Sequence, residues 1–323
     1  MMKLLGLLAA FVFAGLTPVQ AQSNYPNKPV VLVVPFPAGG SSDVVTRVLA
    51  DELSKIWKQQ VVVENKAGGA TVIGNTAVAR ARPDGYTLLM VSSGFVILPA
   101  VRENLPYDPV KDFIPISMFI DTPLAIIASP NFPANTLPEL IALAKQRTDK
   151  PITYCTPGAS STSRMAGELI QRQTGITLKH VAYLGESLAF PDLMAGRVDV
   201  QIGTWSVQRP HVESGKLKLL AVLYRNRLPE APNVPILSEI VDGVTAAQGA
   251  FNSVAAPAGT PPEVVAKIAA DMKTAVESPT FKERILALGA YPRYTAPDET
   301  VQILRRDTAM WSEIAKAANI KVE

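Results

Sequence analysis

Two short loops in the sequence combine residues that suit the binding of an oxyanion. The first, Pro35-Phe-Pro-Ala-Gly-Gly-Ser-Ser-Asp43, follows a run of valines and leads into a stretch where apolar residues recur at helical spacing. Glycines let a ligand approach the main chain, and the N–H groups at a helix N-terminus favour an anion without a cationic partner. A purely structural turn between a strand and a helix explains the same residues, so both interpretations stay open. The loop contains neither Gly-Lys-Ser/Thr nor G-x-G-x-x-G, which separates it from nucleotide-binding loops.

The second loop, Thr156-Pro-Gly-Ala-Ser-Ser-Thr-Ser163, is rich in hydroxyl side chains and is followed by Arg164. Its hydroxyl and amide groups can converge on an oxygen-rich ligand where a strand ends and a helix begins. The alternative is a helix cap with more hydroxyl groups than it needs. If the two loops belong to two facing lobes, they would hold one ligand from both sides.

The loops need strands and helices to position them, and the apolar pattern predicts these elements. Residues 30–34 form a continuous apolar run typical of a buried parallel strand, and a helix follows with Ser41, Ser42 and Asp43 as candidate caps. Further strands are predicted at 61–63, 86–91, 124–128, 152–155, 180–183, 198–202, 217–222 and 251–256. Further helices are predicted at 73–81, 137–145, 164–173, 263–278, 280–288 and 299–318. This alternation predicts the α/β class, with doubly wound parallel sheets flanked by helices.

The order of these elements predicts two lobes. Proline-rich segments at 105–109 and 114–115 precede the strand at 124–128, where we place the crossing into a second lobe of residues 123–247. The strand at 251–256 leads back, so the first lobe comprises residues 22–122 plus 248–323. Two such crossovers make a natural hinge.

Length and composition exclude several classes of protein. The 323 residues include 48% hydrophobic and 18% charged residues, which argues against both disorder and a polytopic membrane protein. The net charge of +3 comes from interspersed Lys and Arg without a long basic run, so we expect no nucleic acid partner. Cys155 is the single cysteine, which precludes an intrachain disulfide, and we interpret it as a small buried residue rather than a reactive thiol.

The N-terminus has the pattern of a secretion signal. Lys3 precedes an apolar stretch over residues 4–16, and Val19 and Ala21 are small residues at the positions that a leader peptidase reads. We therefore predict a signal peptide at 1–21 that is cleaved after Ala21. The alternative is an uncleaved membrane anchor, which the stretch disfavours because it is shorter than the roughly 20 residues that span a bilayer.

Several segments of the mature chain follow one another in a characteristic order. They are the glycine loop at 35–43, Val63-Glu-Asn-Lys-Ala-Gly-Gly69 with Gly74, Pro83-Asp-Gly-Tyr-Thr-Leu88, Tyr107-Asp-Pro-Val-Lys-Asp-Phe113, Tyr154 through Glu168, Tyr183 through Asp199, and Ala256-Pro-Ala-Gly-Thr-Pro261. Each segment alone is modest evidence. Together, over nearly the whole mature chain, their order and spacing resemble the substrate-binding receptors of the tripartite tricarboxylate transporters, called the Bug or TctC family.

The resemblance implies a periplasmic receptor with a two-lobed, type II-like binding-protein fold that closes around a carboxylate-bearing metabolite. It places one carboxylate on the backbone amides of residues 36–40, and it implies contributions from the loop at 156–161 and from the segment around Tyr183. Ser92 and Ser93 fall where members of the family line the cleft. The ligand-binding residues predicted on this basis are Phe36, Pro37, Ala38, Gly39, Gly40, Asp43, Ser92, Ser93, Thr156, Gly158, Ser160, Ser161, Arg164, Tyr183, Gly185, Gly203 and Thr204.

The chain departs from the family pattern at three places. Arg164 stands where the family has His, Leu184-Gly-Glu186 where it has Lys-Gly-Gly, and Gly203 where it has Asp. We hypothesise that Arg164 pairs with a second carboxylate of the ligand, since a guanidinium suits bidentate recognition. The alternative is a solvated helix residue. Glu186 argues the opposite way, because an acid near the site repels dianions or favours an amine-bearing ligand.

Other candidate residues point to binding rather than catalysis. His180 and His211 lack metal-ligand spacing, so we expect no metal or cofactor, and Trp205 either stacks on a ligand or simply packs. A secreted serine hydrolase is the competing class, but the chain has no G-x-S-x-G and no H-E-x-x-H, and we expect no enzyme. We expect a monomer that closes on its ligand and passes it to the permease subunits of a tripartite tricarboxylate transporter. A receptor that signals through a sensor kinase is the alternative.

Overall fold

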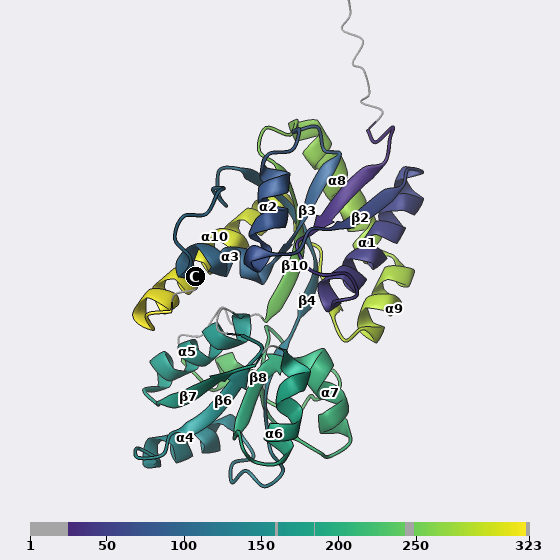
Figure 1. Ribbon diagram of the computed structural model, residues 1–323. Coiled ribbons are helices and arrows are strands. Elements are labelled where there is room, and N and C mark those ends of the chain that lie inside the picture. The colour runs from purple at the N-terminus through teal and green to yellow at the C-terminus, as the bar shows by residue number, and fades with distance from the viewer. Residues whose placement is uncertain (1–24, 159–160, 184, 243–248, 321–323) are drawn as a thin grey trace, which may run out of the picture.

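The computed structural model describes residues 25–158, 161–183, 185–242 and 249–320. They form two β-sheets, each flanked by helices (Figure 1). We call the six-stranded sheet with its helices the first lobe, and the five-stranded sheet with its helices the second lobe. The signal peptide predicted at 1–21 lies outside the described residues.

The sheet of the first lobe has the strand order β11-β4-β10-β3-β1-β2. Its strands are β1 (Val30–Val34), β2 (Val61–Asn65), β3 (Thr87–Ser92), β4 (Phe113–Thr122), β10 (Ala250–Pro257) and β11 (Tyr291–Pro292). Strand β1 is parallel to β2 and β3, as predicted, whereas β10 is antiparallel to β3 and to β4. The sheet is therefore mixed, and the prediction of a wholly parallel sheet is wrong. A buried apolar run has the same composition in either direction, so the pattern carries no information on strand direction.

The sheet of the second lobe has the order β7-β6-β8-β5-β9 and is also mixed. Its strands are β5 (Leu124–Ala128), β6 (Ile152–Thr156), β7 (Leu178–Ala182), β8 (Val200–Thr204) and β9 (Lys218–Leu223). Strand β6 is parallel to β7 and β8, and β5 is antiparallel to β8 and β9. The predicted strands of this lobe lie within a few residues of the observed ones.

Ten α-helices and three short 3-10 helices complete the described part of the chain. The 3-10 helices are η1 (Gly69–Thr71), η2 (Glu186–Ala189) and η3 (Leu237–Glu239). The α-helices are α1 (Ser41–Trp57), α2 (Val72–Ala79), α3 (Ser93–Val101), α4 (Leu137–Gln146), α5 (Thr162–Thr174), α6 (Phe190–Met194), α7 (Trp205–Glu213), α8 (Pro262–Glu277), α9 (Pro279–Ala287) and α10 (Pro297–Ala317).

Strands β4 and β11 and helices α3, α6 and α7 were not predicted from the sequence. Helix α3 is apolar on several faces, with Phe95, Val96, Ile97 and Leu98 all buried, so it shows no amphipathic period. In β4, Pro115 interrupts the pattern, and the pairing of β4 with β10 shifts register next to it. Packing against the rest of the protein, rather than the local residue pattern, therefore decides the conformation of both elements.

The chain crosses between the lobes at two points that lie side by side. Strand β4 ends at Thr122 and β5 begins at Leu124, while Ala250 at the start of β10 pairs with Thr122. Gly249 has a φ of +77°, and a Cβ on it would lie 2.4 Å from the Thr122 oxygen. Helix α10 packs on both α3 and α5, so the C-terminal helix also contacts both lobes (Figure 1).

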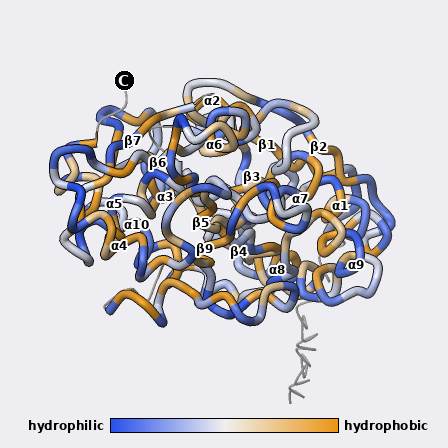
Figure 2. The backbone as a smooth tube through the Cα atoms, turned by 90° about the horizontal axis from the view of Figure 1, so that it is seen from below, coloured by the Kyte–Doolittle hydropathy of each residue, from blue (hydrophilic) through white to orange (hydrophobic). Residues whose placement is uncertain are grey.

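Two large apolar clusters support this arrangement. One runs from Phe95 in the first lobe through Trp311 of α10 to Tyr154 in the second lobe. The other fills the opposite face of the first lobe, between β1, α1 and α8. Along outer helices such as α4 and α9, hydrophobic and hydrophilic stretches alternate (Figure 2). Within the described ranges, no helix combines the length and apolar character that a bilayer crossing needs.

Candidate ligand site between the lobes

A cavity of about 880 Å³ lies between the two lobes. The first lobe contributes the starts of α1 and α3 and parts of β4 and β10, and the second lobe contributes the loop after β6, the region of η2 and the start of α7. Such a volume suits a small ligand. The predicted site residues that line it are Phe36, Gly40, Ser92, Ser93, Gly158, Ser161, Gly185 and Thr204.

The glycine loop brings the N-terminus of α1 to the cavity. The N-cap of α1 is Gly40, which offers no side chain to the first turn, and Gly39 before it has a φ of +79° that glycine adopts readily. Gly40, Ser41 and Ser42 all line the cavity. The main-chain N–H groups of this turn and the positive end of the helix dipole therefore lie where a ligand carboxylate can reach them.

Asp43 holds the glycine loop from behind and does not line the cavity. Its carboxylate accepts hydrogen bonds from the Gly39 N–H (2.8 Å) and from Asn65 Nδ2 (2.9 Å), and it pairs with Arg47 at 2.9 Å. Burial opposes ionisation of Asp43, but the hydrogen bonds from Arg47, Gly39 and Asn65 outweigh it and lower the pKa. The predicted residues Pro37, Ala38 and Gly39 are exposed and also lie outside the cavity lining.

The hydroxyl loop faces the cavity through part of its length. Ser161 is the N-cap of α5, accepting from the Arg164 N–H at 3.1 Å, so the capping interpretation holds for this residue. Ser161 also lines the cavity, and its part in ligand binding stays a prediction. Thr156 is buried beneath the loop, where its Oγ1 contacts the Gly158 oxygen (3.0 Å) and His180 Nε2 (2.7 Å). Ser160, another predicted site residue, lies outside the described residues.

Arg164 is engaged within the second lobe. Its guanidinium pairs with Glu168 at 2.7 Å and donates to the Tyr154 hydroxyl. With its side chain 17% exposed, it is not the solvated helix residue of the alternative interpretation. It is also absent from the described lining of the cavity.

The region around Glu186 supplies the other wall of the second lobe. Thr204 donates to Glu186 Oε1 from its main-chain N–H (2.8 Å) and from its hydroxyl (2.7 Å), and both residues line the cavity. Burial raises the pKa of Glu186 by more than the bonds from Thr204 lower it. Gly203 lies behind this pair, where a Cβ would be 3.3 Å from Glu186 Cδ, and the Tyr183 hydroxyl donates to Asp192 at 2.8 Å. Gly203 and Tyr183 do not line the cavity.

Several cavity residues were missed by the sequence analysis as ligand-site candidates. Ser41 and Ser42 were noted only as caps, although a first-turn position next to a glycine loop is itself a signal. Asn252 comes from β10, far along the chain, and donates to Met90 Sδ and Ser42 Oγ. Nothing in the local sequence marks Asn252, because β10 brings it to the cavity only through its pairing with β3.

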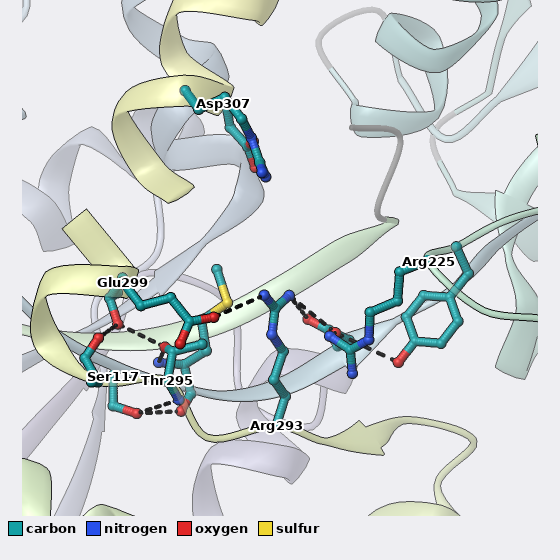
Figure 3. A network of polar contacts seen from close by, with 12 residues as sticks. Ser117, Arg225, Arg293, Thr295, Glu299 and Asp307 are labelled. Atoms are coloured by element: carbon teal, nitrogen blue, oxygen red, sulfur yellow. Dashed lines mark hydrogen bonds and ion pairs between the residues drawn. The ribbon is translucent and has the colours of Figure 1, made fainter. Parts of the chain in front are cut away.

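A buried ion-pair network lies beside the crossings. Asp121 near the end of β4 is 1% exposed and accepts from Arg293 at 3.1 and 3.2 Å, and Arg225 after β9 pairs with the same carboxylate. Figure 3 shows the side chains of Arg225 and Arg293 converging. Because Arg225 belongs to the second lobe and Arg293 to the first, Asp121 links the two lobes.

The remaining candidate residues are His180, Trp205 and Cys155, and each is engaged in contacts within the protein. His180 contacts Thr156, and burial, followed by the charge of Arg164, lowers its pKa to about 4. Trp205 is 2% exposed and donates to Glu230 at 2.8 Å, which is packing rather than stacking on a ligand. Cys155 is buried, as predicted, and burial raises its pKa to about 12. The described residues contain no cluster of three or more potential metal-ligating side chains.

Comparison of the chain with known proteins points to a single family. A UPF0065 protein of Bordetella bronchiseptica is 35% identical over 98% of this chain and 93% of its own length. Protein BugT of Bordetella pertussis is 32% identical over 100% of this chain and 99% of its own length.

Among solved structures, a Rhodopseudomonas palustris protein with adipate is 29% identical, with a TM-score of 0.76 over 92% of this chain and 99% of that one. MatC from the same organism, with bound malate, is 29% identical, with a TM-score of 0.72 over 90% of this chain and 99% of that one. The family model described as the tripartite tricarboxylate transporter family receptor matches residues 45–320. The chain therefore belongs to the TctC family of tripartite tricarboxylate transporter receptors.

Proposed function

We propose that this protein is a periplasmic receptor that captures a small carboxylate between its lobes and delivers it to the permease subunits of a tripartite tricarboxylate transporter. One observation carries the proposal. The N-terminus of α1, capped by a glycine that has no side chain, opens into the cavity opposite the hydroxyl loop that precedes α5. A carboxylate there receives charge-assisted hydrogen bonds from neutral donors, which are short and directional.

The two lobes have different parts in this proposal. Residues 36–42 of the first lobe bind the carboxylate through main-chain N–H groups, and Ser92 and Ser93 add hydroxyl donors at the start of α3. Gly158, Ser161 and Thr204 approach from the second lobe. Because contacts to both lobes form only when the lobes are close, the ligand shifts the population toward the closed form. The permease then distinguishes a loaded receptor from an empty one by shape.

The solved relatives are consistent with this ligand class, since one was solved with adipate and the other with bound malate, both carboxylates. We also propose that the lobes divide at residues 122/123 and at 247/248, the latter outside the described residues. In this proposal the paired crossings serve as the hinge, and cleavage after Ala21 releases a monomeric protein into the periplasm. In that scheme Asp43 and Arg164 shape the two loops, and the ligand contacts neither side chain.

The experiment is a calorimetric and thermal-shift screen of the mature protein, unfolded and refolded beforehand to remove any bound ligand, against mono-, di-, tri- and amino-carboxylates. A ligand at a hundred times its Kd adds about 2.7 kcal/mol of stability. The Ser41→Asp variant places a fixed carboxylate in the first turn of α1, where it complements the helix dipole and repels a ligand carboxylate. The matched control, Ser41→Asn, has nearly the same size and no charge.

We expect Ser41→Asp to keep a melting temperature at or above that of the wild type and to lose at least tenfold in carboxylate affinity, while Ser41→Asn loses much less. If Ser41→Asp binds the best carboxylate as tightly as Ser41→Asn does, the helix terminus is not the binding site. If the protein converts a bound compound into a product, it is an enzyme and the proposed receptor function is wrong.

A further inference from the structure

The charge of the cavity is unusual for a site that would accept two carboxylates. Among the described residues that line it, Glu186 alone has an ionisable side chain, and no Lys, Arg or His takes part. The internal residues outside the description, 159–160, 184 and 243–248, include no ionisable type in the sequence. The cavity therefore offers neutral donors at one end and an acid at the other.

Glu186 is held firmly in place. Its Oε1 accepts both the N–H and the hydroxyl of Thr204, at 2.8 and 2.7 Å, and its main-chain oxygen accepts from Gln201 Nε2 at 3.0 Å. Gly203 keeps the space beside Gln208 and Glu186 free, because a Cβ there would lie 2.7 Å from Gln208 Nε2 and 3.3 Å from Glu186 Cδ. A side chain anchored through both its main chain and one carboxylate oxygen is preorganised for recognition.

The second carboxylate oxygen, Oε2, is buried and makes no hydrogen bond with the described residues. Nor does any described Lys, Arg or His form an ion pair with Glu186. A buried carboxylate oxygen without a partner is costly, and natural structures keep such a group mainly where something else supplies the missing partner. The missing partner is a hydrogen-bond donor, and a cationic one also offsets the charge.

We infer that the ligand carries an ammonium group as well as its carboxylate, and that Glu186 selects it over a dicarboxylate of similar length. The inference rests on the proposed receptor function, with the carboxylate at the start of α1 and the ammonium group toward η2. A second carboxylate in the same place would meet the like charge of Glu186 with no cation beside it, whereas an ammonium group gains an opposite charge there. Glu186 is thus a specificity-determining residue.

The test compares three pairs of compounds by titration calorimetry on the stripped mature protein: 3-aminopropanoate with malonate, 4-aminobutanoate with succinate, and 6-aminohexanoate with adipate. We expect the ammonium-bearing member of the best-binding pair to bind the wild type at least tenfold more tightly than its partner. Glu186→Gln keeps the shape and the acceptor for Thr204 but removes the charge. It should lower the affinity for the ammonium-bearing member at least tenfold and leave the dicarboxylate unchanged or tighter.

Glu283→Gln, the same chemical change on the exposed surface of α9, is the control and should change neither affinity. If the wild type binds the dicarboxylates as tightly as the ammonium-bearing members, or if Glu186→Gln leaves the ratio within twofold, the inference is overturned while the receptor function stands. If no compound of either kind binds the wild type, both the proposed receptor function and the inference are wrong.

Discussion

Ser93 and Thr162 share a hydrogen bond of 2.9 Å between the lobes, joining the first residue of α3 to the first residue of α5. Both residues line the cavity, so the contact lies beside the candidate site. Opening of the lobes at this point has to break it.

A double-mutant cycle isolates this contact. We expect Ser93→Ala and Thr162→Val each to weaken binding of the best carboxylate, because either change removes a bond that favours the closed form. The coupling between them should be about 1 kcal/mol, so the double variant binds little worse than either single variant. Calorimetric affinities of the four proteins measure it. Strictly additive losses would mean that the two hydroxyl groups act on the ligand independently.

The Asp121 network should be a main determinant of stability. Asp121→Asn removes the buried charge that Arg225 and Arg293 share, which costs about 2–3 kcal/mol because Arg225 is partly exposed and Arg293 keeps its ion pair with Glu299. Urea unfolding of the ligand-free protein checks this. Asp149→Asn, on the exposed surface after α4, is the control and should stay within about 0.5 kcal/mol of the wild type. A small effect at Asp121 would show that water replaces the lost charge.

Asp43 should stabilise the glycine loop in a pH-dependent way. Because its pKa is lowered in the folded protein, its contribution is present above the unfolded value of about 3.9 and is lost as the pH falls through the folded value. Asp43→Asn should therefore cost about 1–3 kcal/mol at pH 7. The difference from the wild type should shrink on acidification below about pH 4. Chemical unfolding at several pH values measures it, and a difference that does not vary with pH would contradict the ionic role.

The contribution of Glu186 to stability should depend on pH in the opposite direction to that of Asp43. Its folded pKa is raised by burial, so the ionised form is disfavoured in the folded protein, and stability falls as the pH rises from the unfolded value of about 4.3 through the folded value. We expect ligand-free Glu186→Gln to melt higher than the wild type at pH 7 and close to it near pH 4. Equal melting temperatures at both values would mean that burial of this carboxyl group carries no penalty.

Much of the fold could be predicted from local pattern. Strand β1 and helix α1 were predicted because an apolar run, a glycine turn and a helical repeat each depend on neighbouring residues alone. The direction of β10 could not be predicted, since its pairing with β3 and β4 joins segments more than a hundred residues apart. Helix α3 is buried on several faces, so its sequence lacks the alternation of apolar and polar residues at helical spacing from which a helix is predicted.

The candidate site divides in the same way. The two loops were predicted from local features, because strand ends and helix starts meet at one edge of an α/β sheet. Ser92, Ser93 and Thr204 were predicted from the resemblance to the family, and all three line the cavity. Only the tertiary structure decided which side chains face the cavity. It turns Asp43 toward Arg47 and Asn65, and it turns Arg164 toward Glu168.

The tertiary structure also brings together Glu186 and Gly203, two residues that the resemblance to the family singled out in the sequence. Glu186 and Gly203 are neighbours in space, and the carboxyl group of one lies next to the place that a side chain on the other would take. The physical reason is that charge and packing act between atoms in contact, and residues far apart in the sequence come into contact only when the chain folds. The sequence therefore determined the lobes, the loops and the family, while folding determined that the cavity presents neutral donors at one end and a single acid at the other.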